Sequence, residues 1–355
     1  MSVSVHVLPV EEIKALTLKQ IISPEQILLK PPYLFNLTDQ RLVIDSDCPC
    51  LAHPMKTQTN LPKNSLAEIS TELVVFSDLT LTLLLRLIST CDISIIALNA
   101  INYRNSLTSY RFLVRTNDLQ TARQKLSVFS MLEKIETALT DNAPLLGEPG
   151  ILVMDMDSTT IEIECIDEIA ILAGVGEQVA AVTELAMQGK LDFAQSLHQR
   201  VATLAGSSED ILAAVAKNIP LMPGLETLVS HLQQYHWRIA IASGGFTYFA
   251  DHLKDLLKID AAFANQLEII DGKLTGKVLG KVVDAQVKAD CLLKLSKQYQ
   301  IPHQQTVAMG DGANDLVMMA AASLGIAFHA KDIVKKQADT AIHFTGLDCM
   351  LHWLK

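Results

Sequence analysis

The sequence lacks the features that mark several large classes of protein. It contains no run of lysines or arginines and has a formal net charge of -10, which argues against nucleic acid or an anionic membrane surface as the main partner. The N-terminus has no basic segment followed by an apolar core, and no uncharged apolar stretch reaches membrane-spanning length. We therefore expect a cytoplasmic protein that binds neither nucleic acids nor membranes.

Cysteine is also scarce. Six cysteines in a chain of 355 residues do not make a disulfide framework. Cys48, Cys50 and His53 lie near one another in the sequence, so a metal site is one alternative interpretation. However, no second ligand pair follows at the spacing typical of zinc fingers. We expect reduced thiols without a functional role.

The first 140 residues predict α+β structure without obvious chemistry. Residues 1–70 hold short apolar pieces broken by prolines and are interpreted as an irregular extension. Residues 71–140 show the order strand, helix, strand, strand, helix, with Leu119 to Leu139 read as helical, which is typical of a ferredoxin-like domain. This order resembles the ACT-type regulatory modules of amino-acid enzymes, although a plain packing or dimerisation domain explains it equally well. A homo-oligomer formed through this region is one expectation.

The remaining chain alternates strands with helices, which predicts a doubly wound parallel sheet, and hence an α/β fold. The turn-rich segment from Asp141 to Gly150 marks a boundary, so that residues 148–355 form one domain. Helix-forming residues at about 163–220 predict a helical cap over the end of the first strand, Ile151 to Met154. Because all candidate site residues follow Gly150, a fragment that begins near residue 145 is expected to be active.

Three predicted strands of this domain end in polar residues. Asp155 and Asp157 follow the first strand, Ser243-Gly244-Gly245 ends the second, and Asp311 with Asp315 follows a third. In open α/β sheets the carboxyl ends of the strands line the ligand crevice. An Asp-x-Asp pair alone is more typical of a solvated turn. Here, acids that meet in one crevice would repel one another unless they bound a hard cation, most plausibly Mg²⁺.

The same crevice has the features of an anion site. Gly244 and Gly245 allow backbone N–H groups to approach an anion closely, and Lys288, near the start of a predicted helix, adds a positive charge. A single lysine of this kind is more often a solvated surface residue. The nucleotide-binding patterns G-x-x-x-x-G-K-[ST] and G-x-G-x-x-G do not occur here. Acids, Mg²⁺ and an anion cradle suit phosphoryl transfer through an aspartyl-phosphate.

At these residues the sequence resembles the haloacid dehalogenase superfamily, whose four motifs match in order: Asp155-Met156-Asp157-Ser158-Thr159, Ser243-Gly244-Gly245, Lys288, and Gly310 to Asp315. Four further stretches resemble the phosphoserine phosphatase family within it: Glu164 to Ala170, Gly189 to Phe193, Ser196 to Val201, and Ala262 to Asn265. The resemblance covers about 150–355 and says little about residues before 140.

The resemblance implies a division of roles among the acids. Asp155 would be the nucleophile that becomes phosphorylated, and Asp157 would protonate the leaving oxygen and then deprotonate the attacking water. Mg²⁺ would be held by the Asp155 carboxylate, the Asp157 backbone carbonyl and Asp311, with Asp315 steadying its shell. Elementary electrostatics agrees, because an anionic nucleophile that attacks an anionic phosphate requires neutralisation.

The resemblance also implies the contacts to the substrate. The residues that would hold the phosphoryl oxygens are Ser243, Gly244, Lys288 and Asn314. Glu164 and Arg200 would bind the ammonium and the carboxylate of phosphoserine, since arginine can grip a carboxylate with two hydrogen bonds. Met187 and Phe193 would supply an apolar wall. Without the resemblance, cap packing and a surface ion pair would be the default interpretation of these residues.

The activity implied is hydrolysis of O-phospho-L-serine to L-serine and phosphate, the last step of serine biosynthesis. Two alternatives stay open at this point. One is a related phosphatase for another small phosphomonoester, such as phosphohomoserine. The other is a non-catalytic sensor of serine or phosphate, which the complete set of acids disfavours.

Overall fold

The computed structural model describes residues 2–23, 32–48, 58–62 and 69–355. Its contacts separate a central unit, Pro144–Ala338, from an N-terminal unit that combines Met1–Ala143 with Asp339–Lys355. Cys50 and His53, two of the three residues considered above as possible metal ligands, lie outside the described residues. The described cysteines are buried, free thiols.

The central unit is built on a sheet with the strand order β12-β11-β10-β9-β13-β14. Its strands are β9 (Ile151–Met154), β10 (Arg238–Phe246), β11 (Ala261–Ile270), β12 (Lys273–Leu279), β13 (Thr306–Gly310) and β14 (Leu324–Phe328). Neighbours are parallel except β11 and β12, which form an antiparallel hairpin around Asp271 and Gly272, both with positive φ. All of β9 is buried, as expected of a central parallel strand. The predicted α/β fold with a parallel sheet is confirmed.

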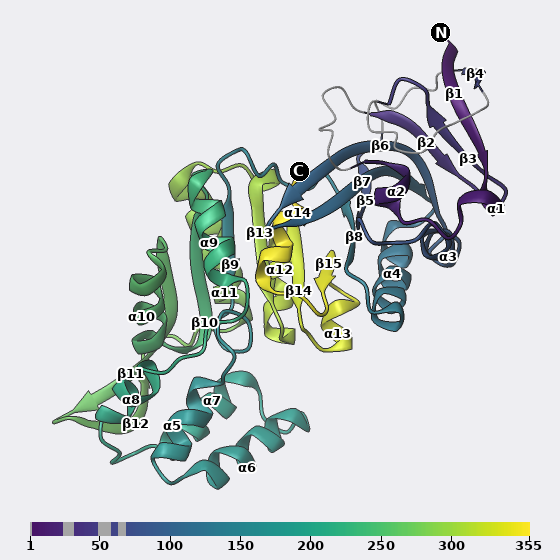
Figure 1. Cartoon of the computed structure of the whole chain (residues 1–355). Coiled ribbons are helices and arrows are strands. Elements are labelled where there is room, and N and C mark those ends of the chain that lie inside the picture. The colour runs from purple at the N-terminus through teal and green to yellow at the C-terminus, as the bar shows by residue number, and fades with distance from the viewer. Residues whose placement is uncertain (1, 24–31, 49–57, 63–68) are drawn as a thin grey trace. The chain divides into compact units, whose positions relative to one another are not determined.

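Helices connect these strands and lie alongside the sheet (Figure 1). They are α9 (Leu225–Gln234), α10 (Thr247–Leu257), α11 (Ala285–Tyr299), α12 (Leu316–Ala321) and α13 (Asp332–Lys335), with short 3₁₀ turns at His303–Gln305 and Ala313–Asp315. Leu225, Leu228 and Leu232 of α9 recur at helical spacing and are buried, which explains why this segment is helical and which face it turns inward.

Of the five helices between β9 and β10, the four that precede α9 gather at one end of the sheet (Figure 1). These are α5 (Cys165–Leu172), α6 (Gly176–Met187), α7 (Phe193–Ala202) and α8 (Asp210–Ala216). The start of α7 is fixed by a capping box, in which Gln195 N–H donates to Asp192 Oδ1 at 2.8 Å and Asp192 N–H donates to Gln195 Oε1 at 3.1 Å. The helical segment predicted after the first strand is therefore present.

The N-terminal unit holds a sheet with the strand order β4-β1-β3-β2-β6-β7-β5-β8. Its strands are β1 (Ser2–Pro9), β2 (Tyr33–Leu37), β3 (Arg41–Asp45), β4 (Gln58–Pro62), β5 (Thr71–Phe76), β6 (Ile93–Arg104), β7 (Leu107–Thr116) and β8 (Thr137–Asp141). Its helices α1 (Val10–Ile13), α2 (Leu18–Ile21), α3 (Leu81–Thr90) and α4 (Leu119–Glu133) follow β1, β5 and β7. The order β8-β5-β7-β6 is ferredoxin-like, and β4-β1-β3-β2 repeats the same order.

Two features of this unit differ from the sequence interpretation. The helix expected up to Leu139 ends at Glu133, because Lys134 adopts a left-handed conformation with φ 56° and the following residues pair with β5 as strand β8. The expected division near residue 70 is crossed by the sheet, since Tyr33 of β2 pairs with Leu98 of β6. The division of the chain into the three domains 1–70, 71–140 and 148–355 stays a prediction.

The C-terminal residues belong to this N-terminal unit. They form β15 (Thr340–Ile342), a 3₁₀ turn at Leu347–Cys349 and α14 (Met350–Trp353). Arg111, which is 1% exposed, donates to the carbonyls of His352 at 2.9 Å and Leu354 at 2.8 Å, and to Glu72 Oε2 at 2.9 Å. Although burial acts in the opposite direction, Arg111 holds the pKa of Glu72 below its usual value.

This packing changes the expectation for an isolated C-terminal fragment. Trp353 and Leu354 are fully buried, and the rings of Trp353 and Phe76 of β5 lie 6.0 Å apart. A chain that begins near residue 145 would keep these apolar residues without the sheet that buries them. We therefore expect copies of such a fragment to associate with one another through the apolar residues of the C-terminal segment.

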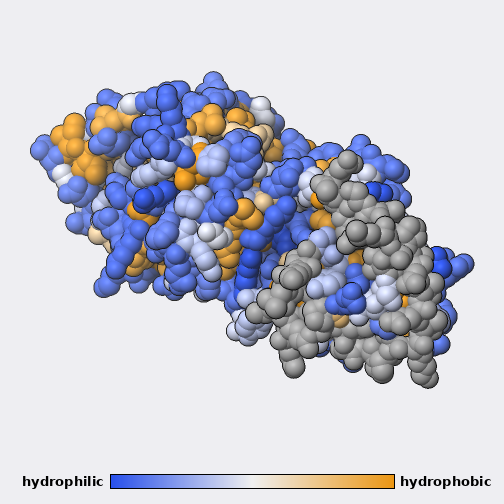
Figure 2. All heavy atoms as spheres, turned by 90° about the horizontal axis from the view of Figure 1, so that it is seen from above, coloured by the Kyte–Doolittle hydropathy of each residue, from blue (hydrophilic) through white to orange (hydrophobic). Residues whose placement is uncertain are grey.

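No helix in the described residues combines the length and the apolar character needed to cross a membrane. On the face shown in Figure 2, apolar residues form small groups separated by hydrophilic ones. Scattered apolar groups of this kind are normal on protein surfaces.

Arg111→Ala should destabilise the N-terminal unit by about 3–5 kcal/mol, because it removes the nearest cation from the buried Glu72 and leaves Lys355 Nζ, at 3.4 Å, as the remaining ion-pair partner among the described residues. Arg86→Ala is the matched control: Arg86 pairs with Glu133 but its side chain is 57% exposed, so about 1 kcal/mol or less is expected. Urea unfolding followed by circular dichroism measures both free energies. Equal losses in the two variants would contradict the role assigned to Arg111.

Candidate active site

The predicted site residues meet at the carboxyl ends of β9, β10 and β13. A cavity of about 380 Å³ lies there. Its wall includes the core residues Asp155, Asp157, Ser243, Gly244, Asp311 and Asn314 and the cap residues Glu164, Phe193, Ser196 and Arg200. Lys288 and Asp315 are fully buried beside it. The side chain of Met187 lies outside the described part of the structure.

Lys288 links the first and last acidic motifs. Its Nζ lies 2.8 Å from Asp155 Oδ1 and 2.7 Å from Asp315 Oδ1. Burial alone would lower the pKa of Lys288, but the carboxylates of Asp155 and Asp315 raise it, so the ammonium stays charged. The lysine is thus a buried partner of the acids rather than a solvated surface residue. Asp284 fixes the start of α11 by accepting a hydrogen bond from Val287 N–H at 2.9 Å.

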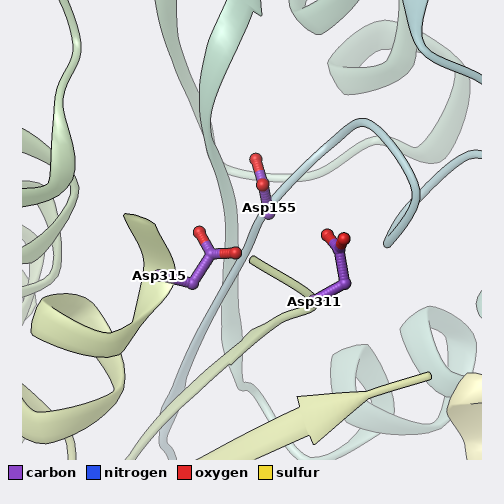
Figure 3. Close-up of side chains that lie close together, drawn as sticks. All are labelled: Asp155, Asp311 and Asp315. Atoms are coloured by element: carbon purple, nitrogen blue, oxygen red, sulfur yellow. The ribbon is translucent and has the colours of Figure 1, made fainter. Parts of the chain in front are cut away.

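Asp155, Asp311 and Asp315 form a cluster in which one oxygen of each lies within 4.8 Å of the others (Figure 3). Burial and the charge of Asp155 raise the pKa values of Asp311 and Asp315. Gly310 makes the cluster possible, because a Cβ at this position would lie 2.3 Å from Asp315 Oδ2. Mutually repelling carboxylate oxygens at this spacing fit a hard divalent cation.

Asp157 lies apart from this cluster. Its Oδ1 accepts a hydrogen bond from the N–H of Cys165, at the start of α5, at 3.2 Å. Burial, together with the charges of Glu164 and Asp155, raises the pKa of Asp157 to about 8. A carboxyl group with this pKa carries a proton at neutral pH and is able to donate it. Gly245 leaves room for the Asp157 side chain, because a Cβ at residue 245 would lie 2.7 Å from Asp157 Oδ2.

The second motif forms a bulge near the end of β10. The pairing of β10 with β11 shifts register between Ala242 and Phe246, and Gly245 N–H donates to Ser243 Oγ at 2.8 Å. The amide of Asn265, which is buried on β11, donates to the Gly244 carbonyl at 2.8 Å and accepts from Val283 N–H at 2.8 Å. Asn265 therefore ties this bulge to the segment before α11.

The sequence interpretation assigned no role to Asn265. The stretch Ala262 to Asn265 carries only a family resemblance, and a single asparagine at the end of an apolar run gives no other signal. Its role depends on contacts with two backbone groups far away in the sequence.

The cap supplies a mixed polar and apolar wall. Ser158, in a left-handed conformation with φ 58°, donates from its hydroxyl to Glu164 Oε1 at 2.9 Å. Burial raises the pKa of Glu164, and the Ser158 hydrogen bond opposes this effect. Arg200 Nε is buried without a hydrogen-bond partner among the described residues. Phe193 contacts the second motif, since a Cβ on Gly244 would lie 2.5 Å from its Cζ.

Comparison with known proteins gives consistent results. The family model of haloacid dehalogenase-like hydrolases matches residues 150–323. The chain is 55% identical over 237 residues to the phosphoserine phosphatase of Vibrio cholerae, covering 67% of this chain and 72% of that protein. It is 57% identical over 218 residues to the phosphoserine phosphatase of Haemophilus influenzae, covering 61% and 69%.

Solved structures agree with these matches. The unliganded crystal structure of a probable phosphoserine phosphatase from Vibrio cholerae has a TM-score of 0.66 and 46% identity, covering 80% of this chain and 86% of that chain. A substrate-bound phosphoserine phosphatase complex has a TM-score of 0.56 and 40% identity, covering 59% of this chain and 99% of that chain.

Magnesium chloride should raise the thermal unfolding temperature of the wild-type protein, because a cation relieves the repulsion within the acid cluster. Saturation at a hundred times the dissociation constant corresponds to about 2.7 kcal/mol. Asp311→Asn should weaken this effect strongly. Asp157→Asn should retain more of it, since the Asp157 side chain lies outside the cluster. Equal losses of magnesium affinity in the two variants would contradict this assignment.

Proposed function

Because the chain belongs to the phosphoserine phosphatase family of the haloacid dehalogenase-like hydrolases, we propose that it hydrolyses O-phospho-L-serine to L-serine and phosphate. The observation that carries this proposal is the single cavity that combines both motif aspartates with Glu164 and Arg200 of the cap. In this proposal the enzyme acts in the cytoplasm and completes serine biosynthesis.

In the reaction, an Asp155 carboxylate oxygen attacks phosphorus and forms an aspartyl-phosphate as the bond to the serine oxygen breaks. Asp157 donates its proton to that leaving oxygen. Asp157 then takes a proton from the water that attacks the phosphorus of the intermediate, which releases phosphate and restores Asp155. The raised pKa of Asp157 supports this exchange, because the group holds a proton before the first step.

Charge neutralisation is divided between Lys288 and a cation. Lys288, in contact with Asp155, offsets negative charge during the attack, and Ser243, Gly244 and Asn314 donate to the phosphoryl oxygens. The acid cluster supports Mg²⁺ as the cation, which would be held by the Asp155 carboxylate, the Asp157 carbonyl and Asp311. Asp315, whose Oδ2 accepts a hydrogen bond from Gly312 N–H at 3.0 Å, would steady its shell. When bound, Mg²⁺ would stabilise negative charge on the transferred phosphoryl group.

The cap selects the substrate in this proposal. Glu164 binds the ammonium group of phosphoserine, and Arg200 binds its carboxylate. The buried and unpaired Arg200 Nε supports this role, since a donor without a partner in a cavity wall is available to a ligand. Phe193 closes the apolar side, and Met187 is proposed to contribute there as well. A homo-oligomer formed through the N-terminal unit, without nucleic acid or membrane partners, stays a proposal.

Asp155→Asn should abolish phosphate release from phosphoserine while leaving the fold intact, because an amide does not attack phosphorus. The wild-type protein should release phosphate with Mg²⁺ and stop when a chelator is added. Asp290→Asn, an exposed acid on α11, serves as the matched control and should keep normal turnover. Normal turnover by Asp155→Asn would remove this residue from the nucleophile role, and an inactive wild type would overturn the proposed function.

Arg200→Ala should lower kcat/KM for phosphoserine by about ten- to a hundredfold, because it removes a charge-assisted contact of about 1.5–3 kcal/mol. An aryl phosphate lacks the amino-acid head group, so its hydrolysis should fall far less. Both substrates are measured on the same preparation. Parallel losses would indicate a general folding or metal defect and would contradict head-group recognition by the cap.

A further inference from the structure

Ser196 on α7 has a hydroxyl that the mechanism above does not use. The residue is 3% exposed, yet it lines the cavity. Within the described residues no hydrogen bond of its hydroxyl is found, and the Asp192 carbonyl one turn earlier accepts the Ser196 backbone N–H at 2.9 Å. Thr183 on α6 shows the common alternative, with its hydroxyl donating to the Val179 carbonyl at 3.1 Å.

The position of Ser196 on its helix explains what this hydroxyl faces. Phe193, Ser196 and Arg200 are spaced by three and four residues, so they share one face of α7, and all three line the cavity. Arg200 Nε on the same face is buried and has no hydrogen-bond partner in the part of the chain that the structure describes. Two unpaired donors thus lie one helical turn apart on the wall of the same cavity.

Donors on a cavity wall that lack a protein partner are available to a ligand, so two on one wall indicate a ligand group that accepts hydrogen bonds from both. A carboxylate has two oxygens with several acceptor positions, more than one arginine fork occupies. The phosphoryl group and the ammonium group already have partners, at the ends of the strands and at Glu164. The carboxylate is the substrate group left for this face.

We propose that the Ser196 hydroxyl donates a hydrogen bond to the substrate carboxylate beside Arg200, and that Ser196 is a specificity-determining residue. This inference rests on the proposed function and deepens it. The chemical class recognised is an α-amino-acid phosphomonoester with a free carboxylate.

The test compares two ligands that differ only in the carboxylate. Phosphoethanolamine has the phosphate and the ammonium of phosphoserine but no carboxylate, and it is measured as a competitor of phosphoserine hydrolysis. Ser196→Ala should lower kcat/KM for phosphoserine about tenfold or more, with the inhibition constant of phosphoethanolamine nearly unchanged. That unchanged constant also shows that the variant is folded. Ser207→Ala, in the same cap but outside the cavity wall, is the matched control and should change neither value.

A double variant tests whether the two residues share one ligand group. If Ser196 and Arg200 bind the same carboxylate, the loss in Ser196→Ala/Arg200→Ala should be smaller than the product of the single losses. Unchanged kcat/KM for phosphoserine in Ser196→Ala, or equal losses with both ligands, overturns the assignment of Ser196 alone. A wild type that does not hydrolyse phosphoserine overturns the proposed function itself, and the inference with it.

Discussion

The central unit depends on one buried cation placed between two carboxylates. Lys288 reaches Asp155 and Asp315 at once, although these residues follow different strands. Without this ammonium, the acids that meet at the strand ends would repel one another in a low-dielectric site, and removing one partner of such a buried group is strongly destabilising. Several acids can therefore lie together at the site and bind a cation only because Lys288 of α11 contacts two of them. Asp284 and Asn265 hold the segment that begins α11.

Much of this arrangement could be predicted from the sequence, because the topology of the sheet determines which strand ends lie next to one another. In a doubly wound sheet the carboxyl ends of adjacent parallel strands must meet, so polar residues after Met154, Ala242 and Gly310 fall into one crevice. Helix and strand periodicity also located the main elements of the central unit. Local sequence is sufficient where the outcome depends on strand order, as for Asp155 after β9 and Asp311 after β13.

The remaining features depend on contacts between distant residues, which periodicity does not encode. The sequence assigns residues up to Leu139 to the preceding helix, yet Thr137–Asp141 forms strand β8, because its partner strand β5 lies some 65 residues earlier and decides its structure. Charged residues in strands, such as Glu72 and Arg111, suggest solvated positions until the C-terminal carbonyls cover them. The roles of Asn265 and Ser196 were missed for a related reason. Whether a single polar side chain has a role depends on which groups it contacts in three dimensions.

The core and the cap divide the chemistry, and Ser158 is the residue that connects them. The acid cluster comes from the segments that follow β9 and β13, whereas Glu164 and Arg200 come from the cap. Ser158 lies in the first motif but donates its hydroxyl to Glu164, and this bond opposes the effect of burial on the pKa of that carboxyl group. The carboxylate form is the one that attracts an ammonium group. The Ser158 hydroxyl of the first motif thus favours the charge state in which the cap would bind an ammonium group, although burial keeps the pKa of Glu164 above its usual value.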